Sequence, residues 1–409
     1  MQKKFFDEIL IADLHIHSRF SRACSHNITF ENLVKWAKIK GLNLLGTGDF
    51  THPLWLKEIK EKLTDCGNGF YYLGDFPFII TGEISLVYTQ EHGRRIHLVL
   101  LVPNIEIAER INLYLDTRGR RDYDGRPIFN IPGDEFVKEM MKISEDIEII
   151  PAHIWTPWFG IFGSMSGFDS LKECFKEQIE NIHAIETGMS SDPEMNWRIK
   201  ELENKAIVSF SDAHSFWPFR LGREATIFSK VNSYSEIIKQ IRNKDFVGTI
   251  ETDPAYGKYH WDGHRNCNFS CSPKESREFN RICPVCKKLL TIGVDNRVGE
   301  LAFFPEGHKI ENAKLFYKIL PLQEVISLFL GTAIETKSCW NLYNSLIENF
   351  GTEFNILLNI PREDFEEKDI GGKLTDLILK NREGKIKVQP GYDGEYGKAM
   401  IGEKQGKLF

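Results

Sequence analysis

Between residues 9 and 252 the sequence repeatedly alternates short apolar segments with longer amphipathic ones. Residues 42–47 and 147–150 have the length and apolar content of β-strands. Residues 30–40 instead place apolar side chains at helical spacing, between Thr29 as a helix cap and Gly41 as a helix stop. Strands that alternate with helices favour a β/α barrel or a related α/β fold. The sequence therefore predicts an α/β domain over residues 1–252.

Side chains that bind metals follow the predicted strands. In the stretch Asp13-Leu14-His15-Ile16-His17 the two imidazoles are two positions apart, so on a strand they point to the same face and can bind one ion. Strand ends that lead into helices are also where barrels and doubly wound enzymes place their chemistry. Later strand ends supply further His, Asp and Glu residues, namely Asp49, His52, Glu83, His97, His153, Asp212 and His214.

Each of these residues alone has an ordinary structural explanation, since Asp often caps a helix and a buried His is often only hydrogen-bonded. Residues 78–88 and 94–102 form a predicted hairpin closed by Glu91-His92-Gly93, and the odd length of that turn places Glu83 and His97 on the same face. Two His/Asp-x-His pairs and a Glu in one domain therefore predict a centre for Zn, Mn or Fe ions.

The overall composition limits the classes of protein that the chain can belong to. The 409 residues carry a formal charge of −6, so any site for a polyanion must be a local patch. No apolar run is long enough to cross a bilayer, and MQKKFFDEIL lacks the apolar core of a signal peptide. Four of the eight cysteines are clustered and the others are scattered, which fits a reducing compartment. We therefore expect a cytoplasmic protein with no membrane segment.

The clustered cysteines have the spacing Cys267-x3-Cys271-x11-Cys283-x2-Cys286, which is close to that of a structural zinc ribbon. The alternative is that His264 replaces one of the four thiolates. The cluster lies in residues 253–299, which lack periodicity, and helical patterning dominates residues 300–409. The sequence therefore predicts three domains, 1–252, 253–299 and 300–409, with residues 388–397 as a turn or small strand.

Two further stretches concern the substrate. Residues 118–126 concentrate arginine, as phosphate contacts require, although the interleaved aspartates make a self-paired surface loop the rival interpretation. Residues 153–163 place several aromatic side chains beside a predicted ligand, where glycine and proline interrupt any helical period. Aromatic side chains at this density usually belong to a core, but a loop of stacking faces beside a metal site suits an extruded base.

The ligand candidates occur in the order of those of a known domain. Asp13-Leu14-His15-Ile16-His17-Ser18, Gly82-Glu83, His97, His153 and Asp212-Ala213-His214 resemble the metal-binding residues of the PHP (polymerase and histidinol phosphatase) domain, a distorted seven-stranded β/α barrel. The resemblance implies that His15, His17 and Asp212 hold one ion, and that Glu83 bridges to a second ion held by His97 and His153. It assigns catalysis to Asp212, Glu83, His15 and His17.

The chain departs from the PHP pattern after the second strand. The family usually has Thr-Asp-His there, whereas this sequence has Gly48-Asp49-Phe50 followed by His52. A further histidine expected shortly after His17 is missing at its usual spacing, and His26 is only a loose substitute. The two-ion core therefore follows the pattern, and a third ion on Asp49, His52 and His214 depends on these departures.

Over nearly its full length the chain resembles one branch of the PHP superfamily, the endonuclease Q family of DNA repair enzymes. The residues that carry this resemblance include 46–53, 155–168, 186–193, 195–198, 211–214, 321–326 and 390–394. The resemblance implies a nick 5′ to uracil, hypoxanthine, xanthine or an abasic site in double-stranded DNA. We expect zinc in the cysteine cluster and in the active site, with Mg²⁺ or Mn²⁺ as the catalytic alternative, in a prokaryotic, nucleoid-associated protein.

The damaged nucleotide is expected to flip into a pocket formed by Trp155, Trp158, Phe159, Gly160, Phe162, Ser166 and Ser190. The arginines expected to contact the DNA backbone are Arg118, Arg120, Arg121, Arg126 and Arg198. The alternatives are a PHP phosphatase that acts on a small phosphate monoester and a noncatalytic binding module, although the second would require lost ligands. Residues 405–409, from Gln405 to Phe409, partly resemble a sliding-clamp-binding peptide but lack its second aromatic residue, so a frayed terminus is the default.

Overall fold

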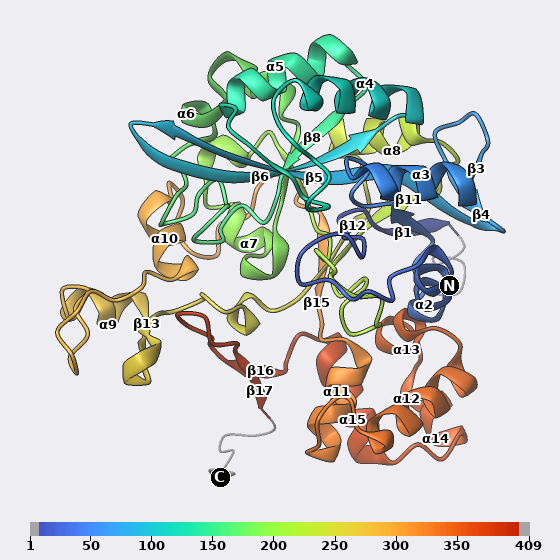
Figure 1. The fold of residues 1–409 in the computed structure, drawn as a ribbon. Helices are drawn as coiled ribbons and strands as arrows, with labels where there is room; N and C mark the ends of the chain where they lie inside the picture. The colour runs from blue at the N-terminus through green and yellow to red at the C-terminus, as the bar shows by residue number, and fades with distance from the viewer. Residues whose placement is uncertain (1–7, 401–409) are drawn as a thin grey trace.

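The computed structural model describes residues 8–400, so the Gln405–Phe409 prediction lies outside the described residues. Its longest strands, β5 (Phe76–Gln90) and β6 (His92–Val102), form a hairpin across the middle of the N-terminal part (Figure 1). The ladder continues to the pair Gln90↔His92, so only Glu91, at φ 63°, separates the strands in place of the predicted three-residue turn. Ser85 lies opposite His97, which puts Glu83 and His97 on one face, as the sequence predicts.

Seven strands form a distorted circuit around the predicted ligands. Strand pairing joins β1 to β2, β2 to β5, β5 to β6, β6 to β8, and β9 to β10. Isolated hydrogen bonds close the other two junctions of the circuit. Ile154 N donates to the Glu186 carbonyl between β8 and β9, and His17 N donates to the Ala213 carbonyl between β1 and β10. The fold is therefore an α/β fold compatible with the distorted barrel that the resemblance implies. The circuit strands beside the hairpin are β1 (Ile9–Asp13), β2 (Leu44–Gly46), β8 (Glu148–Pro151), β9 (Ala184–Glu186) and β10 (Ala206–Val208).

Helices pack around this circuit, and their ends carry the predicted sequence signals. Thr29 caps α2 (Phe30–Lys40) by accepting a hydrogen bond from Asn32 N, and Gly41 ends it in the left-handed region at φ 98°. Pro53 occupies the first turn of α3 (Pro53–Lys62). The other helices of this part are α4 (Ile105–Asp116), α5 (Gly133–Ile143), α6 (Leu171–Phe175), α7 (Pro193–Asn196) and α8 (Tyr234–Arg242).

The segment of residues 193–204 is not one continuous helix. It consists of α7 and a separate 3-10 turn at Lys200–Leu202, because Ile199 between them has extended backbone angles. Trp197 is buried at this break and packs edge-on against Phe316, 5.9 Å between ring centroids. Contacts with a distant strand thus override the local helical pattern.

The region after residue 299 is mainly helical, but one of its strands belongs to the main sheet. β15 (Leu315–Lys318) pairs in parallel with β12 (Gly248–Glu251), which itself pairs with β11 (Ala225–Ser229). Five helices then gather below the barrel (Figure 1), and a hairpin of β16 (Lys387–Gln389) and β17 (Lys398–Met400) follows them. These helices are α11 (Leu322–Leu330), α12 (Lys337–Phe350), α13 (Glu353–Leu358), α14 (Arg362–Glu367) and α15 (Gly372–Arg382).

A buried ion pair joins these helices to the barrel. Lys40 of α2 lies 2.7 Å from Glu353 of α13, and both side chains are fully buried. Tyr343 also donates a hydrogen bond to Glu353, which leaves the carboxylate well satisfied. None of the helices in residues 8–400 combines the length and the hydropathy that a bilayer-crossing segment needs.

The cysteine module (residues 253–299) projects from one side of the barrel (Figure 1). It contains the short hairpin β13 (Asp262–His264) and β14 (Phe269–Cys271), then α9 (Pro273–Glu278) and α10 (Val294–Leu301). Asp262 anchors the module internally, because its carboxylate accepts hydrogen bonds from Gly293 N and the Asn296 side chain.

Candidate metal centre

The segments that follow β1 and β10, together with the middle of β5, bring four predicted ligands together. Ligand atoms of His15, His17, Glu83 and Asp212 all lie within 4.8 Å of one another, and we call these residues the first metal group. His17 Nε2 lies 3.0 Å from Asp212 Oδ1 and 3.2 Å from Glu83 Oε2. His15 Nε2 lies 3.6 Å and 3.5 Å from the same two oxygens.

Glu83 also belongs to a second metal group, with His97 and His153. Its other oxygen, Oε1, lies 2.7 Å from His97 Nδ1 and 3.3 Å from His153 Nε2. The two oxygens of the Glu83 carboxylate therefore face two different clusters of imidazoles. This is the geometry of a carboxylate that bridges two cations, and it has the membership that the resemblance implies.

Unpartnered polar atoms indicate that the first group fits a metal ion. His15 Nε2, His17 Nε2 and Asp212 Oδ1 are buried, and none has a hydrogen-bond partner among the described residues. Each such buried atom costs about 1–3 kcal/mol unless something else satisfies it. Nitrogen and carboxylate donors that converge in this way suit Zn, Mn or Fe.

The pKa shifts of two ligands, Glu83 and His97, suit cations, whereas at His15, His17 and His153 burial lowers the pKa but the neighbouring carboxylates raise it above its ordinary value. Burial raises the pKa of Glu83, but His97, Arg126 and His15 together hold it well below its ordinary value. Burial lowers the pKa of His97 to about 4, against the opposing effect of Glu83. A carboxylate that is ionised and an imidazole that is neutral are the forms that bind a metal.

The backbone of the ligand-bearing loops is held in an uncommon conformation. Asp212, His153 and Asp49 have φ values of 49°, 31° and 44°, in the region that favours glycine. Such positions cost about 1–3 kcal/mol each and persist where surrounding structure enforces them. Their occurrence at three strand exits marks this end of the barrel as a functional site.

Second partners hold the histidine rings in place. Nδ1 of His15 donates to Glu186 across 2.8 Å, and Nδ1 of His153 donates to Thr156 across 3.0 Å. Each contact fixes the tautomer in which Nε2 is free to bind a cation. Glu186 was not among the predicted site residues, because one acidic residue at a strand end looks the same as a helix cap.

Asp49 is a hydrogen-bond partner of the His17 ring, as Glu186 is of the His15 ring. Asp49 is not part of either metal group. Its Oδ1 lies 2.9 Å from His17 Nδ1, and its Oδ2 accepts hydrogen bonds from Ser18 N and the Ser21 hydroxyl. Both oxygens are therefore occupied. The structure places Asp49 as a hydrogen-bond partner of a ligand, in contrast to the expected third-ion ligand.

Among the described residues, the others expected at a third ion do not join Asp49 in a metal group, although the centroid of the His214 ring lies 4.7 Å from that of His17. His52 contacts the Asp122 carbonyl at 3.3 Å and stacks on Phe20, 4.3 Å between ring centroids. His214 directs Nδ1 to the Asp212 carbonyl at 2.8 Å, and His26 is exposed. Within residues 8–400, no metal group combines Asp49, His52 and His214.

The arginine loop (residues 118–126) divides into two kinds of residue. Arg118 pairs with Glu135, Arg120 with Asp122 and Arg121 with Asp116, at 2.8–3.0 Å, as in the self-paired alternative. Arg126 instead points to the metal centre, where its Nη1 lies 3.0 Å from Glu83 Oε2. Arg198, which lies outside this loop, has a buried Nε without a hydrogen-bond partner among the described residues.

The aromatic loop (residues 153–163) likewise has a buried part and an open part. Trp155 and Phe162 are almost completely buried, and Trp155 donates to Asn196, so these rings belong to the core. Phe159 packs on the His97 ring at 4.3 Å, and Trp158 is partly exposed beside Tyr259. Trp158 and Phe159 are therefore the partly exposed aromatic residues of this loop, and Phe159 is the one in contact with a predicted metal ligand.

The remaining predicted pocket residues line the base of the loop. A side chain at Gly160 would collide with backbone atoms of residues 154 and 156, so glycine is required there. Ser166 accepts a hydrogen bond from Phe159 N and so supports the loop. The Ser190 hydroxyl is buried and has no partner among the described residues.

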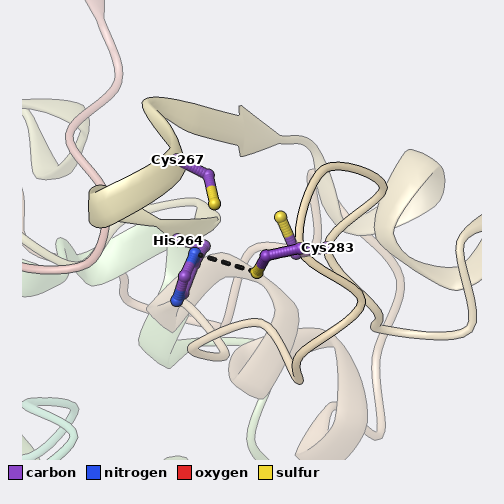
Figure 2. Close-up of side chains that lie close together, drawn as sticks. His264, Cys267 and Cys283 are labelled. Atoms are coloured by element: carbon purple, nitrogen blue, oxygen red, sulfur yellow. Dashed lines mark hydrogen bonds between the residues drawn. The ribbon is translucent and has the colours of Figure 1, made fainter.

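The cysteine module gathers a different set from the predicted four thiolates. Ligand atoms of His264, Cys267, Cys283 and Cys286, which we call the cysteine group, lie within 4.8 Å of one another. Figure 2 shows the side chains of His264, Cys267 and Cys283 converging, and His264 Nδ1 lies 3.5 Å from Cys286 Sγ. Cys271 lies outside the group because it pairs with Asp262, two residues along β13 from His264. The structure thus corrects the Cys271 prediction in favour of the His264 alternative, with a donor set that fits structural zinc.

The chain is similar both to a protein known from its sequence and to proteins of solved structure. Residues 321–385 match the family model "MJ0043 C-terminal domain". The chain is 32% identical over 292 residues to protein MJ0043 of Methanocaldococcus jannaschii. That match covers 68% of this chain but only 34% of MJ0043, so the chain spans about a third of that relative's length.

Solved structures match the whole chain. The lesion-specific endonuclease PfuEndoQ from Pyrococcus furiosus has a TM-score of 0.87 and 30% sequence identity, over 98% of each chain. A structure of Endonuclease Q in complex with a 27-mer duplex substrate, with an abasic lesion at the active site, has a TM-score of 0.86 and 31% identity. That match covers 98% of this chain and 99% of the other.

Proposed function

The chain belongs to the endonuclease Q family of PHP-domain proteins, whose members are metal-dependent DNA-cleaving hydrolases, and on this premise we propose that it nicks duplex DNA at damaged nucleotides. The observation that carries the proposal is the position of Glu83, with one oxygen facing the first metal group and the other facing the second. Such a carboxylate suits a two-cation centre, and two-cation centres cleave phosphodiesters.

The chain's own residues supply a defined environment for this reaction. Bound cations would lower the pKa of a water and stabilise both the attacking and the leaving oxygen of an in-line displacement. His15, His17, Asp212 and Glu83 would hold one cation, and Glu83, His97 and His153 the other. The water oxygen attacks the phosphorus on the 5′ side of the lesion and the P–O3′ bond breaks, which leaves 3′-hydroxyl and 5′-phosphate ends.

The lesions are abasic sites and the deaminated bases uracil, hypoxanthine and xanthine. The bound duplex in the related Endonuclease Q structure, with its abasic lesion at the active site, supports the first of these substrates. The partly exposed rings of Trp158 and Phe159, the second of which packs on His97 of the second metal group, support the flipping of a damaged base, since base–aromatic stacking contributes about 1–3 kcal/mol per base. Weakened pairing at a damaged base lowers the cost of flipping, which adds to selectivity.

Contacts with the duplex outside the centre involve all three parts of the chain. Arg118, Arg120, Arg121 and Arg198 contact the backbone, and the cysteine module and the C-terminal helices clamp the duplex at the barrel mouth. The formal charge of −6 supports a local contact surface in place of a general attraction, so binding is expected to weaken as salt rises. The protein acts in the cytoplasm, at the nucleoid.

The test is a panel of end-labelled duplexes that carry one abasic site, one deoxyuridine or one deoxyinosine, with an undamaged duplex as the control. Each is incubated with Mg²⁺, Mn²⁺ or Zn²⁺, in parallel with a phosphate monoester. We expect one nick 5′ to each lesion and an intact undamaged duplex. Turnover of the monoester without any nick would overturn the proposal in favour of the phosphatase alternative.

A further inference from the structure

Arg126 is the arginine of its loop that reaches the metal centre. Its Nη1 lies 3.0 Å from Glu83 Oε2, whereas the acidic partners of Arg118, Arg120 and Arg121 are surface residues. An arginine guanidinium stays protonated in proteins. A permanent cation therefore lies beside the carboxylate that both metal groups share.

The backbone that carries Arg126 is fixed against the same structure that orients His17. Gly125 N donates to the Phe20 carbonyl, and the Gly125 carbonyl accepts from Thr51 Oγ1. A Cβ atom at Gly125 would lie 2.1 Å from Asp49 Oδ2, so the loop approaches Asp49 as closely as glycine allows. Asp124 also accepts a hydrogen bond from Arg126 N, which holds the start of the arginine in place.

Most of the guanidinium is available to a ligand. A guanidinium has five N–H donors, and within residues 8–400 the contact of Arg126 is the one from Nη1 to Glu83. The side chain is 25% exposed, so its other donors face the open side of the centre. A guanidinium suits a phosphate at such a place, because its planar fork matches two phosphate oxygens.

The charges of the loaded centre favour an anion beside Arg126. Two divalent cations and Arg126 would bring five positive charges. Four carboxylates oppose them, those of Glu83, Asp212, Glu186 and Asp49, and they leave one positive charge. The single negative charge of a phosphodiester neutralises this positive charge. The attraction between the centre and the phosphate then grows in the transition state, because more negative charge develops on the phosphate oxygens.

We propose that Arg126 is a catalytic residue that binds a nonbridging oxygen of the scissile phosphate. The inference rests on the proposed function and adds to it the residue that stabilises the reacting group. Water supplies the oxygen of the new P–O bond and releases its proton to solvent. The electron pair of the broken P–O3′ bond leaves with O3′, which takes up a proton. Arg126 keeps all its protons and acts only through charge and hydrogen bonds.

The test compares Arg126→Met, Arg126→Lys and Arg120→Met on a duplex with one abasic site. We expect Arg126→Met to lower kcat about 10²–10³-fold, the range found when a donor to a developing oxyanion is removed. Arg126→Lys should recover part of the loss, because it restores the charge but not the fork. Arg120→Met is a contrasting variant: as an expected backbone contact it should act mainly by raising KM, and any fall in its kcat should stay well below that of Arg126→Met.

Two measurements without turnover separate this role from a structural one. Bound metal, measured by elemental analysis, and the unfolding temperature should be the same in Arg126→Met as in the wild type. A phosphorothioate at the scissile position should slow the wild type in one diastereomer, and Arg126→Met should lose most of that difference. Loss of metal in Arg126→Met, or an unchanged kcat, would overturn the inference while the wild type still nicks damaged duplexes. A wild type that nicks none of them would instead refute the proposed function itself.

Discussion

One buried carboxylate connects the two metal groups from behind: Glu186 accepts Nδ1–H of His15 at 2.8 Å with one oxygen and the backbone N–H of His153 at 2.8 Å with the other. His15 belongs to the first metal group and His153 to the second. Glu186 therefore orients the ring of His15 and holds the backbone of His153. His153 is the residue whose φ is 31°. This carboxylate therefore links one ligand of each group.

Glu186→Gln should weaken metal binding and lower activity, each by about 10–100-fold, as is typical when the hydrogen-bond partner of a ligand is changed. The amide keeps the size of the side chain but loses its charge and one acceptor. Chelator competition gives the affinity, and nicking of an abasic duplex gives the rate.

Glu148→Gln is the matched control, because Glu148 is also buried and lies 3.2 Å from a histidine, His183, that belongs to neither metal group. This variant should lose stability, through its contact with Arg242, and keep its metal. Wild-type metal affinity in Glu186→Gln would contradict the role assigned to that carboxylate.

The number of ions at the barrel centre should be two. His52→Ala should keep the wild-type metal content, since His52 contacts the Asp122 carbonyl and Phe20. Asp49→Asn should lower the affinity of the first metal group, because Asp49 orients His17. Elemental analysis after dialysis measures both. Loss of one whole ion from His52→Ala would restore the third site that the resemblance implies.

The cysteine module should bind zinc through His264 and three thiolates. Cys286→Ser should release one zinc ion per chain and destabilise the module, because a closed structural site contributes folding free energy directly. Cys271→Ser should retain the zinc, since Cys271 lies outside the cysteine group. Zinc release measured with a chromogenic chelator distinguishes the variants, and release from Cys271→Ser at the same level would favour the four-cysteine ribbon.

Stability should fall as the pH rises towards alkaline values. Burial raises the pKa of Glu251 to about 8, despite hydrogen bonds from Thr249, Thr187 and Ser209. Burial and the nearby Glu251 also raise the pKa of Glu224. A carboxyl whose pKa is higher in the folded state stabilises the fold fully below its unfolded pKa, near 4.5, and this contribution is lost as pH rises through about 8.

Urea unfolding at pH 6 and pH 9 tests this, and the free energy of unfolding should drop by on the order of 1 kcal/mol or more between them. Glu251→Gln stays neutral at both values and should show a smaller drop. The exposed Glu311, changed to Gln, is the control and should leave the difference as in the wild type. An equal drop in Glu251→Gln would refute the assignment.

The parts of the centre that could be predicted are those that strand periodicity controls. A period of two places His15 and His17 on one face, and the same rule with the hairpin register brings Glu83 to His97. Glu186 gave no such pattern, because one acidic residue at a strand end looks the same as a helix cap. Arg126 also could not be told from its neighbours, since only the folded loop shows which arginine faces inward.

The failures of prediction come from contacts that are distant in sequence. The strand β15 was not predicted, because its pairing partner β12 lies more than 60 residues earlier in the chain and nothing local marks it. Cysteine spacing alone could not choose between Cys271 and His264. The choice depends on how the β13–β14 hairpin packs, since His264 lies at one end of it with Cys283 and Cys286 while Cys271 pairs with Asp262 at the other.

The most direct test of the central claim, that the Glu83-bridged centre cleaves damaged DNA, is the mapping of the nick made by wild type and Asp212→Asn in a labelled duplex with one abasic site. The wild type should give a single product that ends 5′ to the lesion with a 3′-hydroxyl that a polymerase extends. Asp212→Asn should unfold at the wild-type temperature and give no product. Cleavage by Asp212→Asn at the wild-type rate, or equal cleavage of the undamaged duplex by the wild type, would contradict the claim.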